Sequence, residues 1–304
     1  MDRRDRIDLF GAASLTGFAL FLAFNQIVIK LVNEGLQPVF FAGLRSAIAT
    51  LALALWLHAR GRPPRLERRY ALVGIAAGLA FALEFVFLFI ALDLTTVTRT
   101  AILLYSMPVW MALGAHVLLP GERITGRRSL GLALAFGGVA LAFADRGGPA
   151  AGSPGGPDLL GDTLALLAAI CWAAIALIAR GTRLREVRPE MQLFWQVLVS
   201  APVLLGVSLF FGPLVRDFQT WHLGGLLFQG VLVSAAGFVF WLWLLSVYPA
   251  SGVASFSFLT PVFGVALGAL LLGEHVGPVL FAALALVAAG LVLINRPARA
   301  AAPG

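Results

Sequence analysis

Long apolar segments, separated by short charged loops, recur along the whole chain. Each has about 20 residues, the length that an α-helix needs to cross the ~30 Å hydrocarbon core of a bilayer. The fifth segment is short and rich in Gly and Ala, so it would have to cross with little tilt. The pattern predicts an all-α membrane protein with ten transmembrane helices: Phe10–Leu31, Gln37–Leu57, Tyr70–Leu92, Thr98–Leu119, Ser129–Ala144, Leu159–Ala179, Met191–Phe211, His222–Ser246, Ala250–Leu272 and Gly277–Asn295.

Composition agrees with this pattern. Hydrophobic residues make up 60% of the chain and charged residues 12%, whereas soluble domains have roughly 45–50% and about 25%. The single cysteine, Cys171, lies inside an apolar segment, which leaves neither a disulfide framework nor metal-ligand spacing. Because no nucleotide-binding glycine loop or Ser-His-Asp arrangement is present, we expect no cofactor, no metal and no enzymatic activity.

The formal charge of +7 could indicate a nucleic-acid partner, but the charges lie almost entirely in short loops. When the loops are assigned alternately to the two sides, seventeen of the twenty-two Lys and Arg residues fall on one side. The positive-inside rule then places both termini in the cytoplasm and argues against nucleic acid. The first segment is expected to be a retained helix rather than a cleaved leader. The other side receives Lys30, Arg99, Arg146 and Arg216, which are expected to be loop charges or, for Lys30, to reach the lipid headgroups.

A stretch rich in Gly and Pro, Asp145–Asp158, cannot hold a regular element and is interpreted as a linker. Five predicted helices precede it and five follow it. An odd number in each half makes the second half enter the membrane from the opposite face. The predicted organisation is a first repeat at 1–146, a linker at 147–158, a second repeat at 159–296 and a cytoplasmic tail at 297–304.

The two halves also share a motif in which a Pro-containing segment is followed by Gly-Glu and later by a Gly. The interval from that Glu to that Gly is sixteen residues in both halves. Inverted repeats of this kind favour alternating access, with a substrate site between the repeats near the middle of the membrane. The matching positions are Tyr105–Trp110, Glu122 and Gly138 in the first half, and Phe258–Phe263, Glu274 and Gly290 in the second.

This repeated Pro, small-residue run and Gly-Glu pattern, together with Leu44-Arg45 in the second helix, resembles the drug/metabolite transporter superfamily in its EamA-like two-repeat permease branch. The resemblance covers nearly the whole chain. It implies a ten-helix exporter of amino acids or other metabolites in a bacterial inner membrane. It also extends to relatives that exchange phosphorylated or nucleotide-linked sugars in eukaryotic organelles. Usage rich in Arg, Ala and Gly fits that bacterial location.

Two ionisable residues lie well inside predicted helices, where insertion of a charge costs roughly 2.5–3.5 kcal/mol. Glu84 and Arg45 are each about eight residues from the same end of their helices, or ~12 Å, and Asn25 and Tyr105 fall at a similar depth. We expect Arg45 to attract a carboxylate or phosphate through its fork of donors. Glu84 would compete for Arg45 or take up a proton. The alternative is a permanent Arg45–Glu84 pair that only fixes helix packing.

The second half has no acid or base at this depth. Its aromatic and amide residues would suit an amphipathic solute, although each tryptophan could instead have a packing or interfacial role. Two prolines are expected to kink equivalent helices and act as hinges, and Glu122 and Glu274 are expected to cap loops. The candidate lining residues are Trp172, Trp195, Gln196, Gln229 and Trp241, and the candidate hinges are Pro108 and Pro261.

Transport therefore accounts best for the sequence, with a small-molecule substrate and the lipid bilayer as partners. Export of a metabolite such as an amino acid is expected, coupled to protons or to a counter-solute. Two alternatives remain open at this stage. One is an importer or exchanger of anionic solutes that relies on Arg45 and Lys30, and the other is a non-transporting membrane scaffold. The oligomeric state is not indicated.

Overall fold

The computed structural model describes residues 7–119, 124–145, 158–248, 253, 256 and 258–295. Within these residues the secondary structure is helical, with one isolated β-bridge between Leu36 and Val215. Eight segments are long and apolar enough to cross a membrane, and two shorter apolar helices, Leu259–Leu272 and Pro278–Ile294, follow them. The predicted all-α class is confirmed, and the first eight predicted spans correspond to these eight segments.

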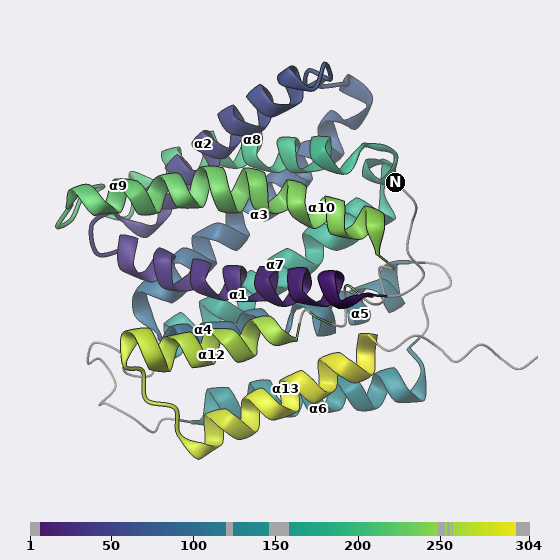
Figure 1. Ribbon diagram of the computed structural model, residues 1–304, viewed down its shortest axis with the longest axis vertical. Coiled ribbons are helices and arrows are strands. Elements are labelled where there is room, and N and C mark those ends of the chain that lie inside the picture. The colour runs from purple at the N-terminus through teal and green to yellow at the C-terminus, as the bar shows by residue number, and fades with distance from the viewer. Residues whose placement is uncertain are drawn as a thin grey trace, which may run out of the picture.

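The described residues form fourteen helical elements, and Figure 1 labels the α-helices among them. The first half comprises α1 (Leu9–Val32), α2 (Pro38–Ala59), α3 (Arg68–Leu94), α4 (Val97–Leu104), α5 (Met107–Leu118) and α6 (Gly126–Ala144). The second half comprises α7 (Leu159–Gly181), the 3₁₀ turn η1 (Arg183–Glu186), α8 (Pro189–Ser208), α9 (Thr220–Leu227), η2 (Phe228–Gly237), α10 (Phe238–Val247), α12 (Leu259–Leu272) and α13 (Pro278–Asn295).

The fourth, eighth and fifth spans differ from the sequence prediction in form or in extent. The fourth span is not one helix, because α4 and α5 are separated at Tyr105 and Ser106. The eighth span contains a π-helical segment, η2, between α9 and α10. The fifth span begins at Gly126 rather than Ser129 and has 19 residues, because the Thr125 hydroxyl caps its first turn by accepting from the Arg128 N–H.

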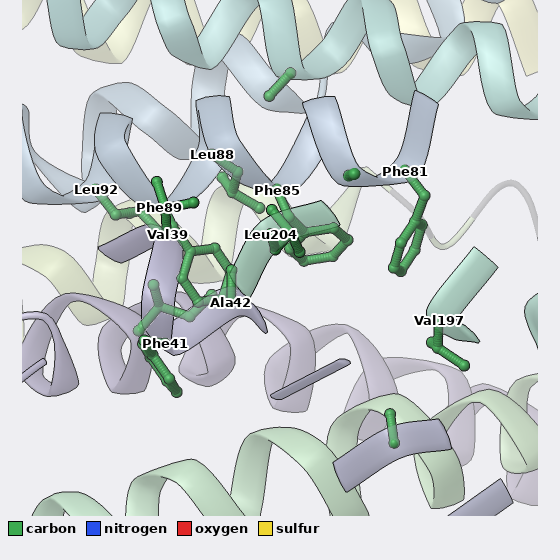
Figure 2. Close-up of a cluster of buried hydrophobic side chains, with 14 of the residues drawn as sticks. Val39, Phe41, Ala42, Phe81, Phe85, Leu88, Phe89, Leu92, Val197 and Leu204 are labelled. Carbon is green, nitrogen blue, oxygen red and sulfur yellow. The ribbon is translucent and has the colours of Figure 1, made fainter. Parts of the chain in front are cut away.

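The main apolar core lies where α3 meets α2 and α8. Phe81, Phe85 and Phe89 recur every four residues along α3 and therefore share one face of that helix. Figure 2 shows this face turned toward Ala42 of α2 and Leu204 of α8. Ring centroids are 4.5 Å apart for Phe81 and Phe85 and 5.6 Å apart for Phe85 and Phe89. This aromatic row fixes α3 against both neighbours.

The helices run side by side, with α2 and α8 at one end of the long axis and α6 and α13 at the other (Figure 1). Their contacts follow a regular scheme: α2 packs on α8, α4 on α12, and α6 on α13. In addition, α3 packs on α7 and α8, while η2 packs on α1 and α2. Each of these contacts between the halves thus has a counterpart in which the two halves are exchanged.

The α6–α13 contact depends on glycines. A Cβ atom placed on Gly290 would lie 2.5 Å from the carbonyl oxygen of Gly131, and one on Gly138 would lie 2.6 Å from the carbonyl oxygen of Ala283. No real Cβ fits at such distances, so only glycine allows these backbones to touch. Small residues at a four-residue spacing commonly serve this purpose in membranes.

Arg99 is not a loop charge, contrary to the sequence prediction. It lies in the first turn of α4 with 2% of its surface exposed. Its guanidinium contacts the fully buried carboxylate of Asp162 on α7, with Nη2–Oδ2 at 2.6 Å and Nε–Oδ1 at 2.9 Å. It also donates to the carbonyl oxygens of Ala142 and Asp145 at the end of α6. One arginine therefore links α4, α6 and α7.

Lys30 also differs from its prediction. Instead of extending to the lipid headgroups, its ammonium donates to the carbonyl oxygens of Leu92 at 2.9 Å and Thr95 at 2.7 Å. These are carbonyls at the end of α3, where helical partners are lacking and a cation is favoured. Lys30 thus caps α3 from α1.

Glu274 has the capping role predicted for it, but on a distant helix. Its two carboxylate oxygens accept from the backbone N–H groups of Val97 at 2.6 Å and Thr98 at 2.8 Å. A carboxylate here satisfies the unpaired donors at the beginning of α4 and complements the helix dipole. Glu122, the equivalent residue in the first half, lies outside the described residues.

Candidate functional site

Arg45 is buried in the middle of the bundle without a conventional partner. It lies on α2 with 6% of its surface exposed, and its guanidinium carbon is 4.1 Å from the ring centroid of Phe85 on α3. Among the described residues, its Nε and Nη1 have no hydrogen-bond acceptor. Stacking on an aromatic face offsets only part of the cost of burying a cation. The guanidinium is therefore available to bind an anion.

Glu84, the residue before Phe85, is equally buried, with 6% exposed. Among the described residues, no nitrogen–oxygen ion pair within 4.0 Å joins Glu84 to Arg45. The two groups nevertheless interact electrostatically across the α2–α3 contact. A permanent pair, the alternative considered from sequence, is not formed in this structure.

Tyr105 and Trp172 are brought together from different halves. Tyr105 follows the last residue of α4 and is buried, and its ring centroid is 5.8 Å from that of Trp172 on α7 in an edge-to-face arrangement. The Tyr105 hydroxyl contacts the side chain of Thr260 on α12 and interacts electrostatically with Glu84. Aromatic and hydroxyl groups thus lie beside the charged pair of residues.

Asn25 and Gln229 form a second polar contact between the halves. The Gln229 side chain is fully buried in η2, and its amide donates to the side-chain oxygen of Asn25 and, at 3.2 Å, to the Asn25 carbonyl oxygen. The side-chain oxygens of Gln229 and the neighbouring Gln26 have no donor among the described residues. Buried polar atoms without partners are rare unless water or a ligand satisfies them. This contact therefore marks a second polar position on the α1–η2 interface.

The other candidates from the second half have different surroundings. Trp195 is 7% exposed and fills the space above Gly74, where a Cβ would lie 2.5 Å from its Cδ2 atom. Trp241 stacks on Phe18 of α1, with centroids 5.4 Å apart. Gln196 is partly buried on α8. Trp195 and Trp241 thus make packing contacts with residues other than Arg45, Glu84 and Tyr105.

Pro108 and Pro261 occupy equivalent places. Pro108 is the second residue of α5, directly after the break at Tyr105 and Ser106, and Pro261 is the third residue of α12. The turn at the break is buried, and it is satisfied locally, since the Ser106 hydroxyl donates to the Leu103 carbonyl at 2.6 Å. Both prolines therefore lie in the first turn of a helix that begins inside the bundle, next to Tyr105 and Thr260.

Sequence reasoning missed Gln26, Asp162 and Thr260. Gln26 follows Asn25 and could have been found by the same depth count. Thr260 directly precedes Pro261 and could have been noticed beside that proline. Asp162 gave a weaker signal, because an acid in the first turn of a helix is ordinarily exposed to solvent and is favoured there by the helix dipole alone.

Comparison with known proteins agrees with this architecture. A profile of the EamA-like transporter family matches the chain twice, at residues 9–144 and 159–296. An uncharacterised protein of Pseudomonas aeruginosa is 33% identical over 280 residues, covering 91% of this chain and 92% of its own. A probable amino-acid metabolite efflux pump of Escherichia coli is 28% identical over 280 residues, covering 88% and 89%.

The fold itself is also known. A crystal structure of a protein with 19% sequence identity superposes with a TM-score of 0.64 and covers 93% of this chain and 97% of its own. Both matches to the family profile span nearly all of the described helices, and the helices pack in the exchanged scheme given above. The chain therefore belongs to the EamA-like transporter family of the drug/metabolite transporter superfamily, as a multi-pass membrane transporter.

Proposed function

We propose that the protein exports small metabolites such as amino acids across a bacterial inner membrane by alternating access, with Arg45 binding an anionic group of the substrate. The observation that carries this proposal is the buried guanidinium of Arg45, which has two nitrogens without an acceptor. Intramembrane ionisable residues mark substrate or ion pathways. A carboxylate placed there would satisfy both nitrogens through the bidentate geometry that arginine favours.

The proposed architecture is ten spans in two inverted repeats of five. It is supported by the double match of the family profile, whose boundaries at 9–144 and 159–296 nearly coincide with repeats at 1–146 and 159–296. It is also supported by the helix contacts, because the contacts between the halves have counterparts in which the first-half and second-half helices change places. With five spans in each half, both termini lie in the cytoplasm, and 147–158 is the linker between the repeats.

We assign this structure to a state that is closed on the outer side. Three polar contacts at the predicted outer ends of the helices join one half to the other. They are the Arg99–Asp162 pair, the Glu274 cap on α4, and the Arg216–Asp93 pair with its nitrogen–oxygen distance of 2.7 Å. An export cycle requires these contacts to loosen so that the substrate can leave.

Amino acids are proposed as substrates because a related efflux pump carries that designation and because the cluster offers a cation beside an acid and aromatic walls. A zwitterionic solute would place its carboxylate at Arg45 and its ammonium near Glu84. In a proton-coupled cycle, Glu84 would then release its proton when the solute binds. In an exchange cycle, it would take part in binding the counter-solute. Because the sequence has no nucleotide-binding loop, the source of energy would be a proton gradient or the gradient of a counter-solute.

Transport by the purified protein in proteoliposomes tests the proposal. Vesicles loaded with a panel of labelled amino acids and neutral analogues are expected to lose at least one of them faster than vesicles without protein. Arg45→Lys keeps the charge but loses the fork of donors, so efflux of anionic and zwitterionic solutes should fall more than efflux of neutral ones. Arg65→Lys, an exposed position in the loop between α2 and α3, is the matched control and should transport normally. Equal losses for every solute would assign Arg45 to packing.

Glu84→Gln separates the coupling role from the binding role. The variant should fold and bind solute but lose the response of efflux to an imposed pH gradient, because glutamine cannot carry a proton. A variant that keeps the wild-type gradient response would remove Glu84 from coupling. No movement of any solute by the wild-type protein, with or without a gradient, would favour a scaffold.

A further inference from the structure

Two cavities meet at the end of α2 that the charge pattern predicts to be cytoplasmic, and neither includes Arg45 or Glu84. The first, of about 250 Å³, is termed here the basic pocket and is lined by Trp56, Leu57, Arg60, Arg62 and Glu190. The second, of about 470 Å³, is termed the apolar groove and extends along α2 from Trp56 toward Ala52. Trp56 lines both, so the two cavities are neighbours that share this side chain as a wall.

The apolar groove lies between α2 and the η2–α10 segment. Ala52 and Leu53 form its α2 wall, and Ala236, Phe240 and Trp243 belong to the opposite wall. Every lining side chain is aliphatic or aromatic. Phe240 is 38% exposed and Ala236 is exposed, so the groove opens to the exterior of the bundle. At this position in a membrane protein, the exterior is lipid hydrocarbon.

The basic pocket has the opposite character. Arg60 and Arg62 are exposed just beyond the end of α2, and the Arg60 guanidinium carbon lies 5.3 Å from the Trp56 ring centroid. This contact places a cation directly above the wall that the two cavities share. Glu190, in the first turn of α8, is the acidic residue of the pocket. Two cations and one acid leave a net positive charge at its mouth.

We propose that the basic pocket and the apolar groove together bind one anionic phospholipid. The phosphate would lie between Arg60 and Arg62, and an acyl chain would follow the groove past Trp56 toward Ala52. The charge complementarity and the adjacency of a basic cavity and an apolar one at Trp56 match the two ends of such a lipid. Basic pockets at this boundary bind anionic headgroups, and tryptophans favour the headgroup level. The leaflet would be the cytoplasmic one, which rests on the proposed orientation.

Native mass spectrometry of the purified full-length protein tests this site. The protein is mixed with equal amounts of phosphatidylglycerol and phosphatidylethanolamine that carry identical acyl chains. Each arginine near an anionic headgroup is expected to contribute about fivefold in affinity. Wild-type protein should therefore retain phosphatidylglycerol in preference by about fivefold or more. Equal retention of the two lipids, or a lipid-free dimer, would overturn the proposal.

Matched variants locate the site. Arg60→Gln with Arg62→Gln should abolish the preference. Arg65→Gln with Arg68→Gln removes two exposed arginines between the end of α2 and the first residue of α3 that line neither cavity, and it should preserve the preference. Equal effects of the two pairs would refute a defined headgroup site.

Two further variants change each cavity separately. Glu190→Gln removes the acid from the basic pocket, so the preference for phosphatidylglycerol should rise. Ala236→Phe fills the apolar groove from an exposed position and should lower retention of both lipids. An unchanged preference in Glu190→Gln, or full lipid retention in Ala236→Phe, would contradict the assigned position of the headgroup or of the acyl chain. Melting temperatures near the wild-type value establish that each variant is folded.

Discussion

Breaking the Arg99–Asp162 pair should destabilise the protein far more than breaking any exposed pair. Asp162→Asn leaves a guanidinium that is 2% exposed beside a neutral amide. Removing one partner of a buried ion pair typically costs about 3–5 kcal/mol, because the remaining charge loses its compensation. Arg99 keeps part of it, since the Asp145 carboxylate lies 4.0 Å from Nη1 and the carbonyls of Ala142 and Asp145 still accept from the guanidinium, which places the expected loss at about 3 kcal/mol.

Replacing both partners gives the more diagnostic result. In Arg99→Met with Asp162→Leu neither fully buried partner is charged, so the main penalty disappears. What is lost is the pair of contacts from Arg99 to two α6 carbonyls, the 4.0 Å contact of Arg99 with the Asp145 carboxylate, and the bond from the Thr95 hydroxyl to Asp162 at 2.9 Å. At about 1 kcal/mol for each hydrogen bond, partly offset by apolar packing, the double variant should lose about 1–2 kcal/mol. It should therefore be more stable than Asp162→Asn.

The assay is reversible unfolding in mixed micelles, followed by tryptophan fluorescence. Arg216 and Asp93 provide the control, because this pair lies at the same end of the bundle but its side chains are 39% and 23% exposed. Asp93→Asn should cost less than ~1 kcal/mol. If Asp162→Asn and Asp93→Asn had equal effects, or if the double variant were less stable than Asp162→Asn, the reasoning about a buried, mutually compensated pair would be refuted.

Two other predictions concern the helix contacts. Glu274→Gln keeps one acceptor for the two N–H groups at the start of α4 and loses the charge, so the free energy of unfolding should fall by about 1–2 kcal/mol; an unchanged value would show that the cap is dispensable. Gly290→Ala should separate α6 from α13 and cost about 1–3 kcal/mol, whereas Gly206→Ala on α8, where nothing lies within 4 Å of the new Cβ, should gain ~0.5–1 kcal/mol. Equal melting shifts for the two glycine variants would contradict the close contact.

Much of the fold could be predicted from apolar length alone, since a bilayer accepts only spans that satisfy their own backbone. Depth counting also predicted that Asn25 and Tyr105 lie at the level of Arg45. It could not predict their partners, because the neighbour that a given helix face contacts depends on how the helices pack. Asn25 meets Gln229, 204 residues away, and Tyr105 meets Trp172.

Arg99 shows why the remaining features could not be predicted. Hydropathy placed it next to a helix boundary, where arginines are usually exposed, and only Asp162, 63 residues later, makes its burial tolerable. The π-helical turns of η2 have a similar origin. The apolar pattern of the segment is that of an ordinary span, and η2 contacts α1 and α2, which the pattern does not specify.

Alternating access at Arg45 is the central claim, and side-specific labelling tests it most directly. In a Cys171→Ala background, the thiol introduced by Arg45→Cys is exposed to a membrane-impermeant reagent, added in turn to right-side-out and inverted vesicles. The account predicts modification from both sides, because the site must open alternately to each compartment. Modification from one side only, or from neither, would contradict it.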